Sequence, residues 1–176
     1  MGHEGVQLSK ASRVRRVFAV LESALFLVLV PGTVVGLVPW WISRWRVEPP
    51  LAGFAPVRLL GALLVAVGVA VLLDSTARFA LQGLGTPAPV LPTRHLVVTG
   101  LYRHVRNPMY VAVVSAIAGQ GLILGNLRVL GYAALVWLGF HLFVLLYEEP
   151  VLRATFGAEY EAFRAAVPRW VPRLRS

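Results

Sequence analysis

The sequence contains no cysteine, so it can form no disulfide and offers no thiol for nucleophilic or redox chemistry. Charged side chains are also scarce, at 14% of the 176 residues. The histidines are few and scattered, without the close spacing of a zinc site: His3, His95, His104 and His141. These absences argue against a disulfide-stabilised domain, a thiol enzyme and a dedicated metal site.

What the chain has in abundance is apolar side chains. Hydrophobic residues make up 57% of the sequence, and the mean hydropathy is +0.71. A soluble domain of this length is less apolar, so we expect a single integral membrane domain over 1–176. The net charge is +9. We do not take it to indicate a nucleic-acid partner, because the basic residues stand at the ends of apolar segments, as in membrane proteins.

Four apolar segments predict an all-α integral membrane protein with about four transmembrane helices: 17–42, 57–81, 109–124 and 129–147. The first lacks a clear cleavage site and is predicted to be a retained span. The short sequence 125–128 should join the last two segments into a tight antiparallel helical hairpin. After Pro150, apolar residues at helical spacing predict a cytoplasmic amphipathic helix at the membrane interface. The domain thus divides into two N-terminal spans (1–82) and a C-terminal part (83–176).

The distribution of basic residues predicts the orientation. With the N-terminus inside and four crossings, 13 of the 17 lysines and arginines lie on the cytoplasmic side. Only Arg44, Arg46, Arg58 and Arg128 lie outside. This asymmetry favours both termini in the cytoplasm. Two glycine pairs spaced four apart, Gly32/Gly36 and Gly121/Gly125, would allow helices to approach closely.

The polar sequence GLYRHVRNPMY, residues 100–110, precedes the third segment. Asn107 suits a helix N-cap and Pro108 suits the first helical position, so the pair should begin that helix. A helix start offers free N–H groups and favours an anion, a preference that Arg106 strengthens. The alternative is that Asn107 only caps the helix and Arg106 only extends towards the interface.

Because a hairpin joins the third and fourth segments, residues 102–110 should lie near Glu148 and Glu149. Two acids at a helix C-terminus oppose the helix dipole and are costly near a membrane, which indicates a function. We expect one to face a ligand and the other an arginine such as Arg103 or Arg153. The alternative is that both only pair with arginines.

His141 lies two helical turns before Glu148, where it could line a cavity or hydrogen-bond a neighbouring helix. Tyr102, Tyr110 and Tyr147 add aromatic faces to the same region. A ligand with a carboxylate, a cation and hydroxyl groups would fit these side chains. S-adenosylmethionine has these parts, and so has a zwitterionic lipid headgroup.

GLYRHVRNPMY, a helical hairpin and EEPVLRATFGAEYEAFRAAVPRWVPR together resemble the isoprenylcysteine carboxyl methyltransferase and phospholipid methyltransferase superfamily of membrane enzymes. The resemblance covers about residues 83–173. It implies an S-adenosylmethionine pocket facing the cytoplasm, with a lipophilic substrate entering from the bilayer. It also implies a bacterial inner-membrane location. Asn107 stands where eukaryotic members usually carry histidine, so no titrating group is expected at that position.

Residues and resemblance together define two sets of candidates. The cofactor-binding candidates are Tyr102, Arg106, Asn107, Pro108, Tyr110, His141, Glu148 and Glu149. The catalytic candidates are Glu148, Glu149 and Arg106, with no metal.

The implied reaction is methyl transfer to a lipophilic acceptor: a phospholipid amine, an isoprenylcysteine-like carboxylate or another small lipophile. An amine acceptor would need a base, for which a glutamate is the candidate, whereas a carboxylate would need none. Two other functions remain open. One is non-catalytic binding of a lipid headgroup, and the other is a sterol-reductase-like oxidoreductase, although the chain has no glycine-rich phosphate motif.

Overall fold

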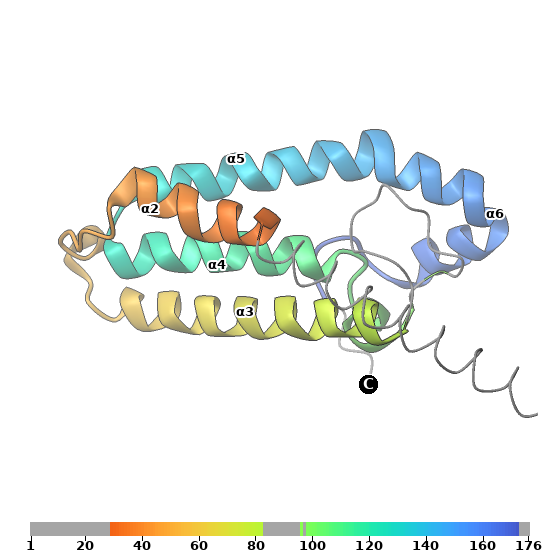
Figure 1. The fold of residues 1–176 in the computed structure, drawn as a ribbon, viewed down its shortest axis with the longest axis horizontal. Helices are drawn as coiled ribbons and strands as arrows, with labels where there is room; N and C mark the ends of the chain where they lie inside the picture. Colours follow the sequence, from red (N-terminus) through yellow and green to blue (C-terminus); the bar gives the residue numbers. More distant parts are fainter. Residues whose placement is uncertain (1–28, 83–95, 97, 173–176) are drawn as a thin grey trace, which may run out of the picture.

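The computed structural model describes residues 29–82, 96 and 98–172 (Figure 1). Every regular element in these ranges is helical. In chain order they are the π-helical turn Gly32–Leu37 (η1), α2 Val38–Ser43, the 3₁₀ turn Leu51–Gly53 (η2), α3 Val57–Gln82, the 3₁₀ turn Gly100–Arg103 (η3), α4 Pro108–Leu124, α5 Leu127–Phe143, the π-helical turn Val144–Glu148 (η4) and α6 Glu149–Ala166.

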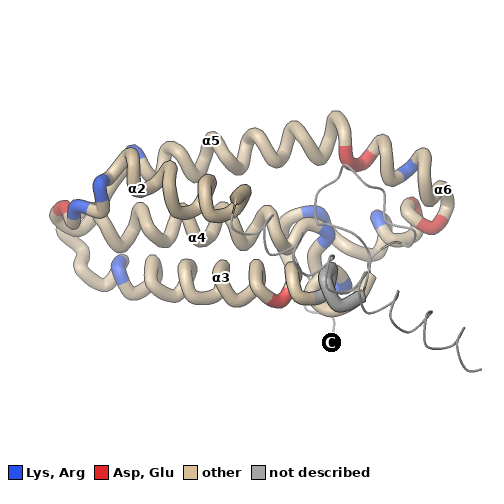
Figure 2. Tube along the Cα trace, in the orientation of Figure 1, with Lys and Arg blue, Asp and Glu red and all other residues tan. Residues whose placement is uncertain are grey.

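The four helices α2, α3, α4 and α5 lie along the long axis of the molecule, and α4 contacts each of the other three (Figure 1). The chain reverses between successive helices, so its connections gather at two ends. We call one the turn end, formed by residues 43–57 and 125–127. The other is the α6 end, formed by residues 98–107 and 144–172. The charged residues drawn in Figure 2 gather at these two ends, with apolar helix between them.

The predicted segments 57–81, 109–124 and 129–147 are helices, and the predicted hairpin is formed by α4 and α5. Two helices are long and apolar enough to cross a membrane, Val57–Ala77 and the continuous helix Leu127–Ala166. Shorter apolar helices cover Leu29–Ser43 and Pro108–Leu124. Residues 17–28 of the predicted segment 17–42 lie outside the described residues, as do residues 83–95 and 97 between α3 and η3. The number of spans therefore stays a prediction.

Glycine allows α3 and α4 to pack unusually closely. A Cβ placed on Gly61 would lie 2.6 Å from the backbone oxygen of Gly119, and one on Gly68 would lie 2.7 Å from that of Ala112. Larger side chains at these positions would push the two helices apart.

The two glycine pairs expected to serve close packing differ. Gly36 has no described residue within 4 Å of its Cβ position, so no close approach is found there in the described part of the chain. Cβ atoms added to Gly121 and Gly125 would collide with Leu130 and with the backbone of Pro49, so these two glycines do lie in close contacts. The contact between α3 and α4 itself uses glycines seven residues apart on α3.

At the turn end, Gly125 ends α4 with a left-handed backbone conformation, φ +70°. Glycine adopts this conformation without steric cost. The next residue, Asn126, caps α5: its side-chain oxygen accepts hydrogen bonds from the N–H groups of Arg128 and Val129. Its Nδ2 donates to Glu48 Oε1 at 2.8 Å, which ties the hairpin to the loop before α3.

At the other end, α5 continues through η4 into α6 and the chain then turns back at Gly157 (Figure 1). Gly157 has φ 50° and ψ −122°, a conformation that side chains other than glycine strongly disfavour. The single amphipathic helix expected after Pro150 is therefore two helical pieces joined by a sharp bend. The bend directs residues 158–170 back towards the start of α4. The location of α6 at a membrane interface stays a prediction.

Candidate functional site

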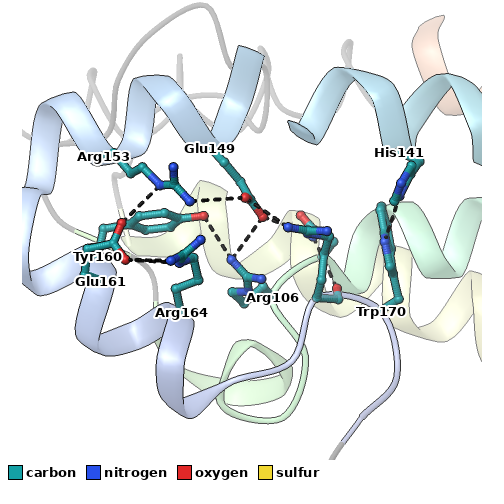
Figure 3. Close-up of polar contacts among 10 residues, drawn as sticks. Arg106, His141, Glu149, Arg153, Tyr160, Glu161, Arg164 and Trp170 are labelled. Carbon is teal, nitrogen blue, oxygen red and sulfur yellow. Dashed lines mark hydrogen bonds and ion pairs between the residues drawn. The ribbon is translucent and has the colours of Figure 1, made fainter. Parts of the chain in front are cut away.

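Arg106, on the loop before α4, lies beside Glu149, the first residue of α6 (Figure 3). Its Nη1 lies 3.1 Å from Glu149 Oε1 and donates a second hydrogen bond, also 3.1 Å, to the hydroxyl of Tyr160. The Arg106 and Glu149 side chains are only 9% and 5% exposed, so this ion pair is almost fully withdrawn from water. The sequence-based expectation that these two regions meet is confirmed.

A second arginine, Arg169, holds the same carboxylate from the other side. Its Nε lies 2.7 Å from Glu149 Oε1 and its Nη2 lies 3.1 Å from Oε2, a bidentate arrangement. Arg153 approaches Glu149 less closely, at 4.0 Å, and its closer partner is Glu161. The expected arginine partners were Arg103 or Arg153. The ion pair with Arg153 is confirmed, but the closer contacts come from Arg106 and Arg169, which were not expected as partners.

Sequence analysis also missed Tyr160 and Arg169 as site residues. Tyr160 is 2% exposed, yet along the chain it is one aromatic residue among several on an amphipathic helix. Arg169 stands in a proline-broken tail that no helical pattern describes. The only available signal was its setting, PRWVPR, within the motif that carries the family resemblance.

Glu148 has a different environment from its neighbour. Its Oε2 accepts a 3.0 Å hydrogen bond from the hydroxyl of Tyr110 on α4, whose ring stacks on Phe140 of α5. Among the described residues, this is the one hydrogen bond that the Glu148 carboxylate accepts. The expectation that one glutamate pairs with arginine is confirmed for Glu149, whereas the ligand contact expected of the other glutamate stays a prediction.

The two carboxyl groups also differ in pKa. A helix needs about 20 residues to cross the bilayer core, and a span that begins at Leu127 reaches this length at Leu146. Both glutamates therefore lie beyond the membrane-spanning part of this helix. Burial raises the pKa of Glu148, with a further contribution from the charge of Glu149, although the hydrogen bond from Tyr110 opposes the shift. Burial would raise the pKa of Glu149 too, but the Arg169 hydrogen bond and the charges of three arginines lower it. Glu149 is therefore the stably ionised member of the pair.

Tyr102 belongs to the same region. Its side chain is half-buried on η3. Burial, and then the charge of Glu148, raise the pKa of its phenol. The tyrosine therefore stays protonated at neutral pH, as a hydroxyl able to donate a hydrogen bond. Tyr147 is 48% exposed and contacts the ring of Phe143, so it lies at the margin of the cluster.

Asn107 and Pro108 begin α4 at the expected positions, N-cap and first helical residue. The expected side-chain cap is absent: the Asn107 side chain makes no hydrogen bond to the first turn of α4. Its Nδ2 instead donates to the backbone oxygen of Arg169 at 3.2 Å. The side chain is used to hold the C-terminal segment because that segment docks against the loop before α4.

Of the two roles expected for His141, lining a cavity or bonding a neighbouring element, the structure shows a hydrogen bond. Its Nδ1 accepts a 3.2 Å hydrogen bond from Trp170 Nε1 (Figure 3), and its ring stacks on Trp137. The π-helical turn η4, which ends at Glu148, breaks the α-helical register that the two-turn spacing between His141 and Glu148 assumed. Trp170 thereby joins the segment after α6 to α5.

A shallow cavity of about 580 Å³, largely open to the surface, lies between α3 and η3. It is lined by Val67, Ala70, Val71, Asp74, Gly100, Leu101, Arg103 and His104. One wall of the cavity is apolar and belongs to α3. The charged side chains of Asp74 and Arg103 lie at one end of the cavity. In a 3₁₀ turn, residues three apart share a face, so Leu101 and His104 face the cavity together. Such a volume suits a small amphiphile.

The donor set at the α6 end fits a ligand that carries both charges. The largely buried Arg106 and the partly exposed Arg169 share one glutamate, which leaves positive charge for an anion. The Nε of Arg106 is buried and has no hydrogen-bond partner in the described part of the chain. Glu148 offers an acceptor for hydroxyl or ammonium groups, and Tyr102 and Tyr110 offer aromatic faces. These residues match the carboxylate, ammonium and ribose hydroxyls of S-adenosylmethionine.

Comparison with known proteins identifies the family of this chain. Residues 57–159 match the phospholipid methyltransferase family, PEMT. Eighty residues are 36% identical to a protein-S-isoprenylcysteine O-methyltransferase from Schizosaccharomyces pombe, covering 44% of this chain and 34% of that protein. The chain thus aligns with about a third of the length of this relative. The match to PEMT extends over more than half of the chain, from α3 into α6, and the protein therefore belongs to the phospholipid methyltransferase family.

Proposed function

We propose that this protein transfers a methyl group from S-adenosylmethionine to a lipophilic acceptor at the cytoplasmic boundary of the membrane. One observation carries the proposal: in a chain of this family, Arg106 from the loop before α4 bonds Glu149, and Tyr110 from α4 bonds the adjacent Glu148, at one end of the bundle. Glu149 is occupied by arginines, which leaves Glu148 as the acidic group for a ligand. Family membership favours this function over headgroup binding without chemistry and over a reductase.

The residues have separate roles in this proposal. Arg106 binds the carboxylate of the donor, and Glu148 accepts hydrogen bonds from its ammonium or hydroxyl groups. S-adenosylmethionine supplies a methyl group that is already activated on a sulfonium. The protein therefore contributes mainly by orienting the reactants and excluding water. With an amine acceptor, Glu148 can also take the proton, because burial raises its pKa and makes it the stronger base.

The cavity between α3 and η3 supports a lipophilic acceptor. Its apolar wall continues the exposed apolar face of α3, where Leu63 and Leu73 are more than half exposed. An acyl or prenyl chain could lie along this wall, with its polar group towards Asp74 and Arg103. The cavity is beside η3, which also carries Tyr102. We therefore place the entry of the acceptor at this side of the bundle.

The test incubates the protein in lipid nanodiscs with labelled S-adenosylmethionine and a membrane lipid extract, and identifies labelled products by mass spectrometry. We expect labelled lipid, reduced about 100-fold by Glu148→Gln, which removes the charge and keeps the shape. Ala70→Trp fills the cavity and should raise KM for the acceptor but not the Kd for S-adenosylmethionine. Ala62→Trp, also exposed on α3 but outside the cavity, is its control. Binding of NADPH, with no labelled lipid, would contradict the proposal.

A further inference from the structure

The segment Val167–Trp170, after α6, is built into the α6 end. The backbone oxygen of Pro168 accepts a 2.9 Å hydrogen bond from the N–H of Arg106. The backbone oxygen of Arg169 accepts one from Asn107, and the Trp170 indole donates to His141. Three consecutive residues are thus fixed against the start of α4 and the face of α5. A segment held at this many points can set the position of a side chain that it carries.

That side chain is Arg169, and its guanidinium occupies both oxygens of Glu149. Arg106 reaches the same carboxylate through Nη1 alone, and its Nε has no partner in the described residues. A carboxylate with one arginine tends to bind it bidentately. Without Arg169, Glu149 would therefore draw Arg106 into a two-point contact. The presence of Arg169 leaves Arg106 with nitrogens to offer elsewhere.

We propose that Arg169 is a positioning residue that acts through Glu149 to keep Arg106 directed at the carboxylate of the methyl donor. This inference rests on the proposed function. It assigns Glu149 to the support of the site and leaves ligand contact to Arg106 and Glu148. It also makes the last part of the described chain a component of the donor site.

The experiment measures the Kd for S-adenosylmethionine by calorimetry, and KM and kcat for donor and acceptor, in nanodiscs. Arg169→Ala should raise the Kd and KM for the donor about 10- to 100-fold, because a displaced binding group loses its alignment. The KM for the acceptor should not change. Arg169→Lys keeps the charge without the bidentate geometry and should restore part of the affinity. Arg164→Ala, which removes an exposed arginine paired with Glu161, should change the donor Kd less than twofold.

A double-mutant cycle tests whether Arg169 acts through Glu149. We expect Arg169→Ala combined with Glu149→Gln to bind the donor no more weakly than Glu149→Gln alone. Strictly additive losses, or an Arg169→Ala variant that binds like the wild type, would overturn the inference while leaving the proposed function in place.

Amide hydrogen exchange, measured without S-adenosylmethionine, distinguishes a failure of this inference from a failure of the proposed function. Arg169→Ala should speed amide hydrogen exchange in residues 105–110, where the N–H of Arg106 is bonded to Pro168, and Arg164→Ala should not. Unchanged exchange in Arg169→Ala overturns the inference even if the wild type binds no S-adenosylmethionine. A wild type that binds no donor overturns the proposed function.

Discussion

Two asparagines precede the two helices of the C-terminal hairpin, one at each end of the bundle, and their side chains are used differently. Asn126, at the turn end, bonds the first turn of its own helix, two and three residues away. Asn107, at the α6 end, leaves its helix uncapped and bonds the backbone of Arg169, 62 residues away. Both occupy N-cap positions before a helix of 17 residues. The residue type therefore predicts the helix start at both ends, but the side-chain partner only at one.

The acids of the two ends differ in the same way. Glu48, at the turn end, is exposed and accepts a hydrogen bond from Asn126. Glu149, at the α6 end, is 4% exposed and is held by Arg106 and Arg169. The turn end thus joins neighbouring loops with interactions that remain close to water. The α6 end concentrates charge in a buried network, and its stability depends on every member being present.

The largest effect should come from removing the buried acid. We expect Glu149→Ala to lower the free energy of unfolding by about 3 kcal/mol, because two arginines lose their shared partner inside the protein. Glu48→Ala should cost no more than about 1 kcal/mol, because water can replace the lost hydrogen bond. Equilibrium unfolding in SDS, followed by circular dichroism, measures both. Equal losses of stability in the two variants would contradict the proposed difference in burial between Glu149 and Glu48.

Acid should weaken the α6 end selectively. The pKa of Glu149 lies below its ordinary value of 4.5, so the folded state favours the ionised form. The resulting stability is fully present above the unfolded pKa and is lost as pH falls through the folded pKa. Unfolding measured from pH 6 downwards should therefore show a steeper loss below about pH 4.5 in the wild type than in Glu149→Gln. A Glu149→Gln profile parallel to that of the wild type would contradict the assignment of the buried ion pair.

The smallest effects should come from the asparagines, and these test the comparison most directly. Asn126→Ala should cost about 1 kcal/mol of stability through loss of the cap, with no change in affinity for S-adenosylmethionine. Asn107→Ala should cost a similar or smaller amount, because it removes one hydrogen bond. It should, however, weaken donor binding severalfold by loosening the segment that carries Arg169. Calorimetry measures the affinity of both variants for S-adenosylmethionine. Weaker binding by Asn126→Ala would contradict the conclusion that only the α6 end contributes to the donor site.

Sequence patterns succeeded where the interactions are local or follow from topology. Apolar runs located α3, α4 and α5, and Gly125 with Asn126 located the turn between the last two. That turn makes α4 and α5 antiparallel, so the start of one must lie near the end of the other. The meeting of Arg106 with Glu149, and of Tyr110 with Glu148, follows from this arrangement. Their roles in binding a donor stay predictions.

Patterns failed where backbone irregularities change direction or register. His141 was placed by an α-helical repeat, but the π-helical turn before Glu148 breaks that repeat. Arg153 was a reasonable partner for Glu149, because it lies one helical turn away, yet it remains 4.0 Å distant. Arg169 takes the closer position, since the bend at Gly157 returns the chain to the start of α4. No periodicity in the sequence indicates the direction of that bend.

The sequence by itself determined that the chain is a helical membrane protein and that its polar loop and paired acids share one end of the hairpin. Hydrophobic segment length and a two-residue turn are sufficient for this, because both act over short distances along the chain. Only the tertiary structure decided which arginines neutralise Glu149, and that Glu148 bonds Tyr110 and no arginine among the described residues. Those choices depend on where the chain lies after Gly157, and that path is set by docking against α4 and α5 rather than by local preference.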